Sequence, residues 1–338
     1  MPFELHVWGS IGELPSFDPD CLAAILYLQV AATPSDYVIV PSSNPLLSND
    51  CMLVSRPILW DNMLTDPSDR LPAVRVNRTI VASGIFDVLR FFQSEGFDLN
   101  SDLSPTQKAQ NVALSTFISD NFTILSLYIQ RLHILHFQEI FRPGLIQLIP
   151  FPLQYAAPMF LFTAAKRRIA HVHDLDSATS DSSFGRNSSV PGILFLKKQA
   201  IRYSDVQDTV PKTLVDKINK TAGGASEFSG VLRMLNLAGE VLASIESALS
   251  ESEGPYLFGE KPKSADVLLL SHLLVETLPK YASPFVKDLI ESRYSYIQKY
   301  LDENKDLVSI NLEDVKVASV HPQDRLTIRN IIKKCTGY

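Results

Sequence analysis

The chain has 338 residues, of which 46% are hydrophobic and 20% charged, and its formal net charge at pH 7 is -6. This composition is too apolar for a disordered chain, and the length is enough for two ordinary domains. The negative charge, without clustered Lys and Arg, disfavours nucleic-acid binding. Cys21, Cys51 and Cys335 are far apart and lack zinc or redox spacing, which predicts a reducing compartment. Met1-Pro2 leads almost directly into a strand pattern, so we expect no secretory signal.

The first part of the chain alternates between strand and helix patterns. Asp18 can cap a helix whose first turn suits Pro19, and apolar residues then recur at helical spacing. The predicted elements in chain order are a strand at 3–8, a helix at 19–31, a strand at 37–41, strands at 71–74 and 79–81, and a helix at 85–92. These elements predict a small α/β domain at residues 1–97 that opens with a strand-helix-strand unit.

Long helical patterns follow a polar connection. Apolar residues recur at steps of three and four over 111–141, 232–249 and 284–301, which predicts three amphipathic helices, the first of them continuous to Phe141. Residues 265–274 are apolar on nearly every face, which is typical of a helix at the centre of a bundle.

These patterns predict an all-helical domain at residues 105–302. Residues 173–192 are rich in Ser and Asp and offer no apolar face, so we expect a flexible loop there. Residues 303–338 form a C-terminal tail without a clear periodicity.

Two groups of histidines have spacings that could suit a metal. One is His133, His136 and Glu139, three residues apart, and the other is His171 and His173 with Asp174 and Asp176. Neither group has an evident further ligand or general base, and histidines are common on the polar side of amphipathic helices. We therefore predict no metal site and no cofactor.

Cys21 is the strongest candidate nucleophile, because it falls in the first turn of a predicted helix, where the helix dipole lowers the pKa of a thiol. Asp18 and Asp20 oppose that shift, so structural burial is the better interpretation. The chain carries no Ser-His-Asp signature, phosphate-binding Gly loop or Walker sequence. We predict no catalytic residue.

Residues 143–165 carry no charge and are followed by Lys166, Arg167 and Arg168. Hydropathy alone suggests a membrane span, but the stretch contains four prolines, which free backbone groups that hydrocarbon cannot satisfy. The four are Pro143, Pro150, Pro152 and Pro158. Two interpretations stay open: burial inside the helical domain, or an exposed apolar surface for a partner or for the membrane interface.

The order of elements resembles the glutathione-transferase fold, a thioredoxin-like domain joined to a helical bundle. Leu71-Pro72 matches the cis-proline position before the third strand of that fold, and Ser83 matches the serine that opens the following helix. Residues 256–262 with Asp266 resemble the family's buried-helix motif, in which Asp266 would close a capping box. Lys263 stands where Ser or Thr is usual, so Ser264 or a backbone arrangement must substitute.

The ligand positions of that fold are altered. The first tyrosine is Tyr27, well inside a helix, so Ser10, Ser16 and Cys21 are the only candidates for the residue that activates glutathione. Ala82 stands before Ser83, where the family has Glu or Gln to hold the amine of glutathione. A methyl group accepts no hydrogen bond, and losing a charged contact costs about 1.5 to 3 kcal/mol.

Two segments resemble the metaxin family, including the metaxin-like subunit of the fungal mitochondrial sorting and assembly machinery. One comprises residues 4–9, 14–16 and 20–23, and the other comprises residues 149–153, Pro158 and 166–168. The resemblance covers about residues 4–302. It implies a non-catalytic subunit on the cytosolic face of the mitochondrial outer membrane that aids the insertion, folding and release of β-barrel precursors.

The implied partners are the β-barrel core subunit, a second metaxin-like subunit, the outer-membrane precursor translocase and β-barrel precursors, with peripheral membrane contact. Our candidate contact residues are Phe151, Leu153, Phe160 and Phe162, because they lie in the uncharged stretch. The alternative is a divergent glutathione-transferase-like enzyme that uses Cys21 or Ser16.

Overall fold

A four-stranded mixed sheet forms the N-terminal part of the computed structural model, which describes residues 2–44, 47, 71–173, 211–221, 225–304, 307, 317–325, 327 and 329–330. The strands are β1 (Phe3–His6), β2 (Tyr37–Val40), β3 (Ala73–Val76) and β4 (Thr79–Ser83), in the order β2-β1-β3-β4. β1 pairs in parallel with β2 and antiparallel with β3, and β3 pairs antiparallel with β4. The predicted strand-helix-strand opening is confirmed, because α1 (Pro19–Ala31) links β1 to β2.

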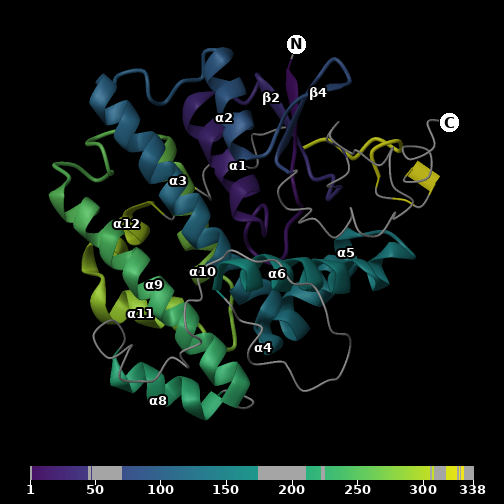
Figure 1. Cartoon of the computed structure of the whole chain (residues 1–338). Helices are drawn as coiled ribbons and strands as arrows, with labels where there is room; N and C mark the ends of the chain where they lie inside the picture. The colour runs from purple at the N-terminus through teal and green to yellow at the C-terminus, as the bar shows by residue number, and fades with distance from the viewer. Residues whose placement is uncertain are drawn as a thin grey trace, which may run out of the picture.

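Helices α1 and α2 (Ile85–Ser94) pack beside each other on the sheet (Figure 1). The Asp18 side chain accepts a hydrogen bond from the Cys21 backbone N–H at 3.0 Å, which caps α1 as predicted. The centroid of the Phe92 ring lies 5.8 Å from that of Phe3 and 5.6 Å from that of Tyr27. Odd residues of β1 therefore point into the helix-covered core, and Glu4 and His6 point to the other face.

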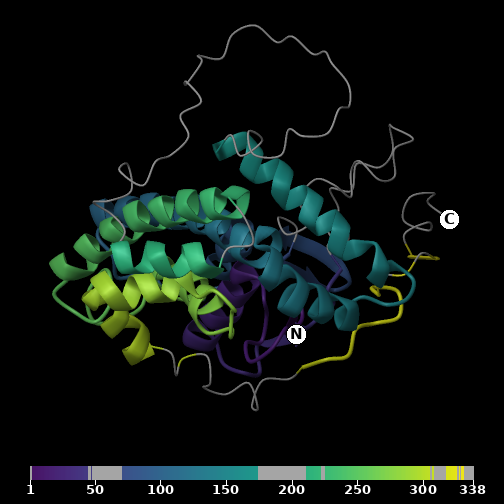
Figure 2. The same ribbon diagram turned by 90° about the horizontal axis from the view of Figure 1, so that it is seen from below.

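The rest of the described chain is mostly helical (Figures 1 and 2). Its elements are α3 (Pro105–Leu127), the π-helical η3 (Tyr128–Leu132), α4 (Ile134–His136), the π-helical η4 (Phe137–Phe141), α5 (Arg142–Leu148), the 3₁₀ turn η5 (Leu153–Tyr155), α6 (Ala157–His173), α8 (Lys212–Thr221), α9 (Ala225–Glu251), α10 (Ser264–Thr277), α11 (Phe285–Arg293) and α12 (Ser295–Asn304). α10 is buried along nearly its whole length against α1 and α3, which confirms the predicted central helix.

The predicted continuous helix over 111–141 is wrong. The backbone of His133 adopts an extended conformation (φ -69°, ψ 115°), which interrupts the helix between two π-helical segments. The break brings the His133 and His136 rings into a stack with centroids 3.7 Å apart, and His136 Nε2 accepts the Ser283 N–H at 3.1 Å. Ser283 lies 147 positions along the chain from His136, so the apolar periodicity of this segment does not contain the signal that interrupts the helix.

The predicted helix at 284–301 is divided into α11 and α12 at Tyr294 (φ -115°, ψ 80°). The Tyr294 hydroxyl donates to the Gly239 carbonyl at 2.9 Å. Glu246 of α9 accepts the backbone N–H groups of Tyr296 at 3.0 Å and Ile297 at 2.9 Å. These contacts satisfy the first turn of a new helix, so the neighbouring helix α9 makes the break possible.

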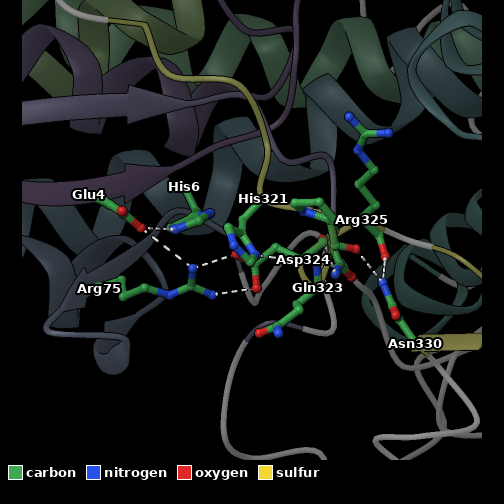
Figure 3. A network of polar contacts seen from close by, with 10 residues as sticks. Glu4, His6, Arg75, His321, Gln323, Asp324, Arg325 and Asn330 are labelled. Carbon is green, nitrogen blue, oxygen red and sulfur yellow. Dashed lines mark hydrogen bonds and ion pairs between the residues drawn. The ribbon is translucent and has the colours of Figure 1, made fainter.

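The described part of the C-terminal tail lies against the sheet (Figure 3). Val317 bridges Ile39 of the edge strand β2 in parallel, and Ala318 N–H donates to the Ile39 carbonyl at 3.0 Å. Arg75 of β3 meets Asp324 of the tail on the face that carries Glu4 and His6. The tail therefore covers part of the sheet face opposite α1 and α2.

α6 ends at His173, and the rest of the loop predicted at 173–192 lies outside the described residues. Within the described ranges, one helix, Pro105–Leu132, has the length and hydropathy of a membrane span, and 61% of its most apolar window is buried in the fold. A core helix of a folded domain gives the same signal. The stretch 143–165 is broken into α5, η5 and the start of α6, as its prolines predict.

Candidate functional site

The three candidate nucleophiles near the start of the chain make contacts that do not activate them. Cys21 is fully buried, its Sγ accepts the Trp8 backbone N–H at 3.4 Å, and burial, with Asp18, raises the pKa of its thiol. Ser16 is also buried, and its Oγ accepts the Asp18 N–H at 3.2 Å. Ser10 is exposed and donates to the Gly12 carbonyl at 3.0 Å. None of these contacts supplies the adjacent base that activates a nucleophile.

Pro72 and Ala82 are both buried at the sheet. The Leu71–Pro72 peptide bond is cis, as expected from the resemblance, and the Pro72 carbonyl accepts the Gly84 N–H at 2.9 Å. Ala82 pairs with Val74 across the sheet and is buried. Its methyl group offers no acceptor for a ligand amine, so the position can only pack.

The histidine group on α4 is part of the core. His136 uses both ring nitrogens, with Nδ1 donating to the Ile129 carbonyl at 3.0 Å and Nε2 accepting from Ser283. Burial, followed by the neighbouring His133, lowers the pKa of His136 to about 3, so the ring is neutral at pH 7. Glu139 points to solvent. The residues that the structure describes contain no group of three metal-ligand side chains, and the side chains of His171 and His173 with Asp174 and Asp176 lie outside them.

The start of α10 carries the capping arrangement predicted for Asp266. Its two carboxylate oxygens accept the N–H groups of Leu257 at 2.8 Å and Lys263 at 2.9 Å. Burial outweighs these bonds and raises the pKa of Asp266 to about 6. The ammonium of Lys263 cannot accept a hydrogen bond and pairs instead with Asp102 at 2.5 Å.

The side chains of Asn100 and Asn111 cap the start of α10, where Lys263 offers no acceptor. Asn100 Oδ1 accepts the Ser264 N–H at 3.2 Å, and Asn111 Oδ1 accepts the Ala265 N–H at 3.2 Å. Both amides also donate to the Ser264 hydroxyl, at 3.0 Å from Asn100 and 2.7 Å from Asn111. The sequence did not identify either residue, since neither lies near α10 along the chain.

A buried polar cluster that the sequence also missed connects α1, α3 and α10. Ser126 Oγ donates to Glu276 Oε1 at 3.0 Å and lies 3.4 Å from His272 Nδ1, and His272 Nε2 lies 3.9 Å from Asp20 Oδ1. Serine, histidine and aspartate are the residue types of a hydrolase triad. Burial lowers the pKa of His272 to about 3, so it cannot act as a base near neutral pH. The cluster therefore supports helix packing.

An exposed apolar surface lies where η5 meets α6. Phe151 is 75% exposed, Tyr155 67% and Met159 53%, and the Phe151 and Tyr155 rings are 6.3 Å apart in an edge-to-face arrangement. Met159 follows Tyr155 by four positions, in the first turn of α6, so the three residues lie in one short segment. We call them the Phe151 surface.

Only one of the four predicted contact residues belongs to this surface. Phe151 belongs to it, whereas Leu153 is buried, and Phe160 and Phe162 are half-buried, with the Phe162 ring 5.4 Å from that of Phe137. Tyr155 and Met159 were missed, although their spacing from Phe151 is visible in the sequence. Whether any of these residues contacts a partner stays a prediction.

Comparisons with known proteins identify relatives of one kind. The family model Tom37, described as outer mitochondrial membrane transport complex protein, matches residues 21–161. Metaxin-1 of Homo sapiens is 25% identical over 157 residues, which are 46% of this chain and 29% of the human protein. Metaxin-1 of Mus musculus is also 25% identical over 157 residues, 43% of its length. The match thus spans less than half the length of these relatives.

Proposed function

Because this chain is metaxin-like, we propose that it is a non-catalytic subunit of the sorting and assembly machinery of the mitochondrial outer membrane. It sits on the cytosolic face and aids the insertion, folding and release of β-barrel precursors by protein-protein contacts. The observation that carries this proposal is the Phe151 surface, a group of large exposed apolar side chains on a chain whose candidate nucleophiles are unactivated.

The proposal includes a glutathione-transferase-like fold, with a thioredoxin-like domain at 1–97 and a helical domain at 105–302. The strand order β2-β1-β3-β4 and the cis peptide before β3 support the first domain. The capping role of Asp266 on a buried α10 supports the second. The scaffold is kept for its surfaces, because Ala82 offers no acceptor for glutathione, Ser16 and Cys21 are buried, and the exposed Ser10 hydroxyl donates to the Gly12 carbonyl.

The Phe151 surface is the proposed contact with the β-barrel core subunit. A surface of this kind loses affinity when its aromatic anchors are removed, because a few large side chains carry most of the binding energy of an interface. The second metaxin-like subunit and the precursor translocase take other faces of the chain.

Co-purification after mild detergent extraction tests the proposal. We expect the tagged chain to recover a β-barrel membrane protein, and we expect a variant with Phe151→Ser, Tyr155→Ser and Met159→Ser to lose it. The matched control changes three exposed apolar residues elsewhere, Val81→Ser, Phe86→Ser and Tyr296→Ser, and should recover the complex. A protein found wholly in the soluble fraction contradicts the proposal, as does retention on immobilised glutathione with an activity that Cys21→Ala or Ser16→Ala abolishes.

A further inference from the structure

A wide groove of about 720 Å³ lies between the N-terminal half of α3 and the C-terminal end of α9. In both views these helix ends lie at the side of the molecule opposite α5 (Figures 1 and 2), so the groove is separate from the Phe151 surface. Its lining residues come from α3, from the end of α9 and from the turn before α10. They are Gln107, Gln110, Ala113, Leu114, Phe117, Ala248, Glu251, Ser252, Glu253, Leu257, Phe258 and Gly259.

The floor of the groove is apolar. Leu114, Phe117 and Phe258 are all half-buried, so each keeps part of its side chain accessible from the groove. The groove is open rather than enclosed, whereas a small-molecule pocket covers most of the surface of its ligand. An open apolar channel between two helices instead fits the apolar face of a third helix.

The charge on the rim of the groove is negative. Among the described residues that line the groove, Glu251 and Glu253 are the only charged ones, and both are exposed. Glu251 is also the last residue of α9, a helix whose final turn has no basic side chain, so the negative end of the helix dipole adds to the two carboxylates. The nearest lysines along the chain, Lys108 and Lys261, do not line the groove.

We propose that this groove binds a basic amphipathic helix of a partner protein. The apolar face of that helix lies on Leu114, Phe117 and Phe258, and its Arg or Lys side chains meet Glu251 and Glu253. The inference is independent of the proposed function, because it concerns another surface and is tested on the purified chain alone.

The probe is a fluorescent peptide of roughly 18 residues, about five helical turns, built from Leu, Ala and Arg with the arginines on one face. A scrambled peptide of the same composition has the same charge and no apolar face. We expect anisotropy titrations to show tighter binding of the amphipathic peptide, with an affinity that falls as salt screens the rim. Equal binding of the two peptides, or no binding of either, overturns the proposal.

Charge-neutral variants locate the site. Glu251→Gln with Glu253→Gln should weaken binding about twofold to thirtyfold, which is the range expected for the loss of two exposed ion pairs. The control, Glu95→Gln with Glu139→Gln, removes the same charge from exposed positions outside the groove and should bind as the wild type does. If the control weakens binding equally, net charge alone explains the effect and the proposal fails.

A second variant tests the lining of the groove rather than its two glutamates. Ala113→Arg places a bulky cation in the lining of the groove from an exposed position of α3, so folding is not at risk. We expect it to abolish preferential binding of the amphipathic peptide. A photo-crosslinker in the peptide should attach to α3, to α9 or to residues 257–259, and attachment mainly elsewhere overturns the assignment.

Discussion

Arg75 on β3 and Asp324 in the C-terminal tail form a two-pronged ion pair, with Nη1–Oδ2 at 2.5 Å and Nη2–Oδ1 at 2.7 Å, across 249 positions of the chain. Arg75 also lies 3.5 Å from Glu4, so a single guanidinium connects two strands to the tail (Figure 3). Asn44 adds a hydrogen bond to the Asp324 carbonyl at 2.8 Å. These contacts attach the tail to the open face of the sheet.

Removing the Asp324 carboxylate should release the tail. Asp324→Asn loses the charge that pairs with Arg75, and we expect the free energy of local opening to fall by about 1 to 3 kcal/mol. The measurement is hydrogen exchange at the Ala318 amide, which donates to Ile39. The control, Asp87→Asn, breaks an exposed pair with Arg90 and should leave that amide unchanged.

The ion pair between Arg75 and Asp324 should break only in acid. Burial alone would raise the pKa of Asp324, but the hydrogen bonds and charge of Arg75 outweigh it and hold the pKa below the ordinary value of 3.8. The ion pair therefore stabilises the tail fully above pH 3.8, and the stabilisation is lost as the pH falls through the lower folded-state pKa. Ala318 protection that disappears at or above pH 5 contradicts this prediction.

Glu276 should make the protein less stable as the pH rises. Burial raises its pKa from 4.5 to about 8, so the folded state keeps a proton that the unfolded state releases. The free energy of unfolding then falls as the pH rises from 4.5 to about 8, by at most about 1.4 kcal/mol per pH unit. His272, with its pKa lowered from 6.5 to about 3, has the opposite effect below pH 6.5.

Between pH 6.5 and 8, the pH dependence of the unfolding free energy therefore reports on Glu276 and not on His272. In Glu276→Gln the neutral amide replaces the neutral acid, and we expect a flatter dependence of unfolding free energy on pH in this interval, measured by urea denaturation. Glu139→Gln, on an exposed residue, serves as the control and should keep the wild-type slope. Equal slopes for Glu276→Gln and the wild type would show that the carboxyl is already ionised.

Asn111 should be required for the stability of α10. Asn111→Ala leaves the Ala265 N–H and the Ser264 hydroxyl short of a buried partner, at a cost of about 1 to 3 kcal/mol in the free energy of unfolding. Thr116→Ala on the exposed side of α3 should change stability by less than about 0.5 kcal/mol. Chemical denaturation of the two variants compares these costs, and similar values would contradict the capping role.

Cys21 should resist alkylation in the native protein. A thiol that is fully buried, with a raised pKa, reacts only after local or global unfolding. We expect peptide-resolved mass spectrometry to find Cys21 unmodified by iodoacetamide at pH 7.5 under conditions that modify it completely in urea. Rapid native modification would favour the enzyme alternative.

Sequence signals were sufficient where structure is local. Asp18 and Pro19 predicted the start of α1, its end at Ala31 matched, and the apolar circumference of 265–274 predicted the burial of α10. Of the candidate site, the sequence named Phe151 but left burial and exposure of its stretch open, and it could not distinguish exposed Phe151 from buried Leu153. Exposure of one residue in an uncharged stretch depends on which neighbours cover it.

By itself the sequence determined the types of the elements, the capped start of α1, the capping role of Asp266 and the resemblance to metaxins, because these follow from residue spacing and short motifs. Tertiary structure alone decided the breaks at His133 and Tyr294, the attachment of Asp324 to Arg75 and the burial of the Ser126 cluster. The physical reason is that these features depend on hydrogen bonds between residues distant along the chain, which form only after helices and strands have packed together.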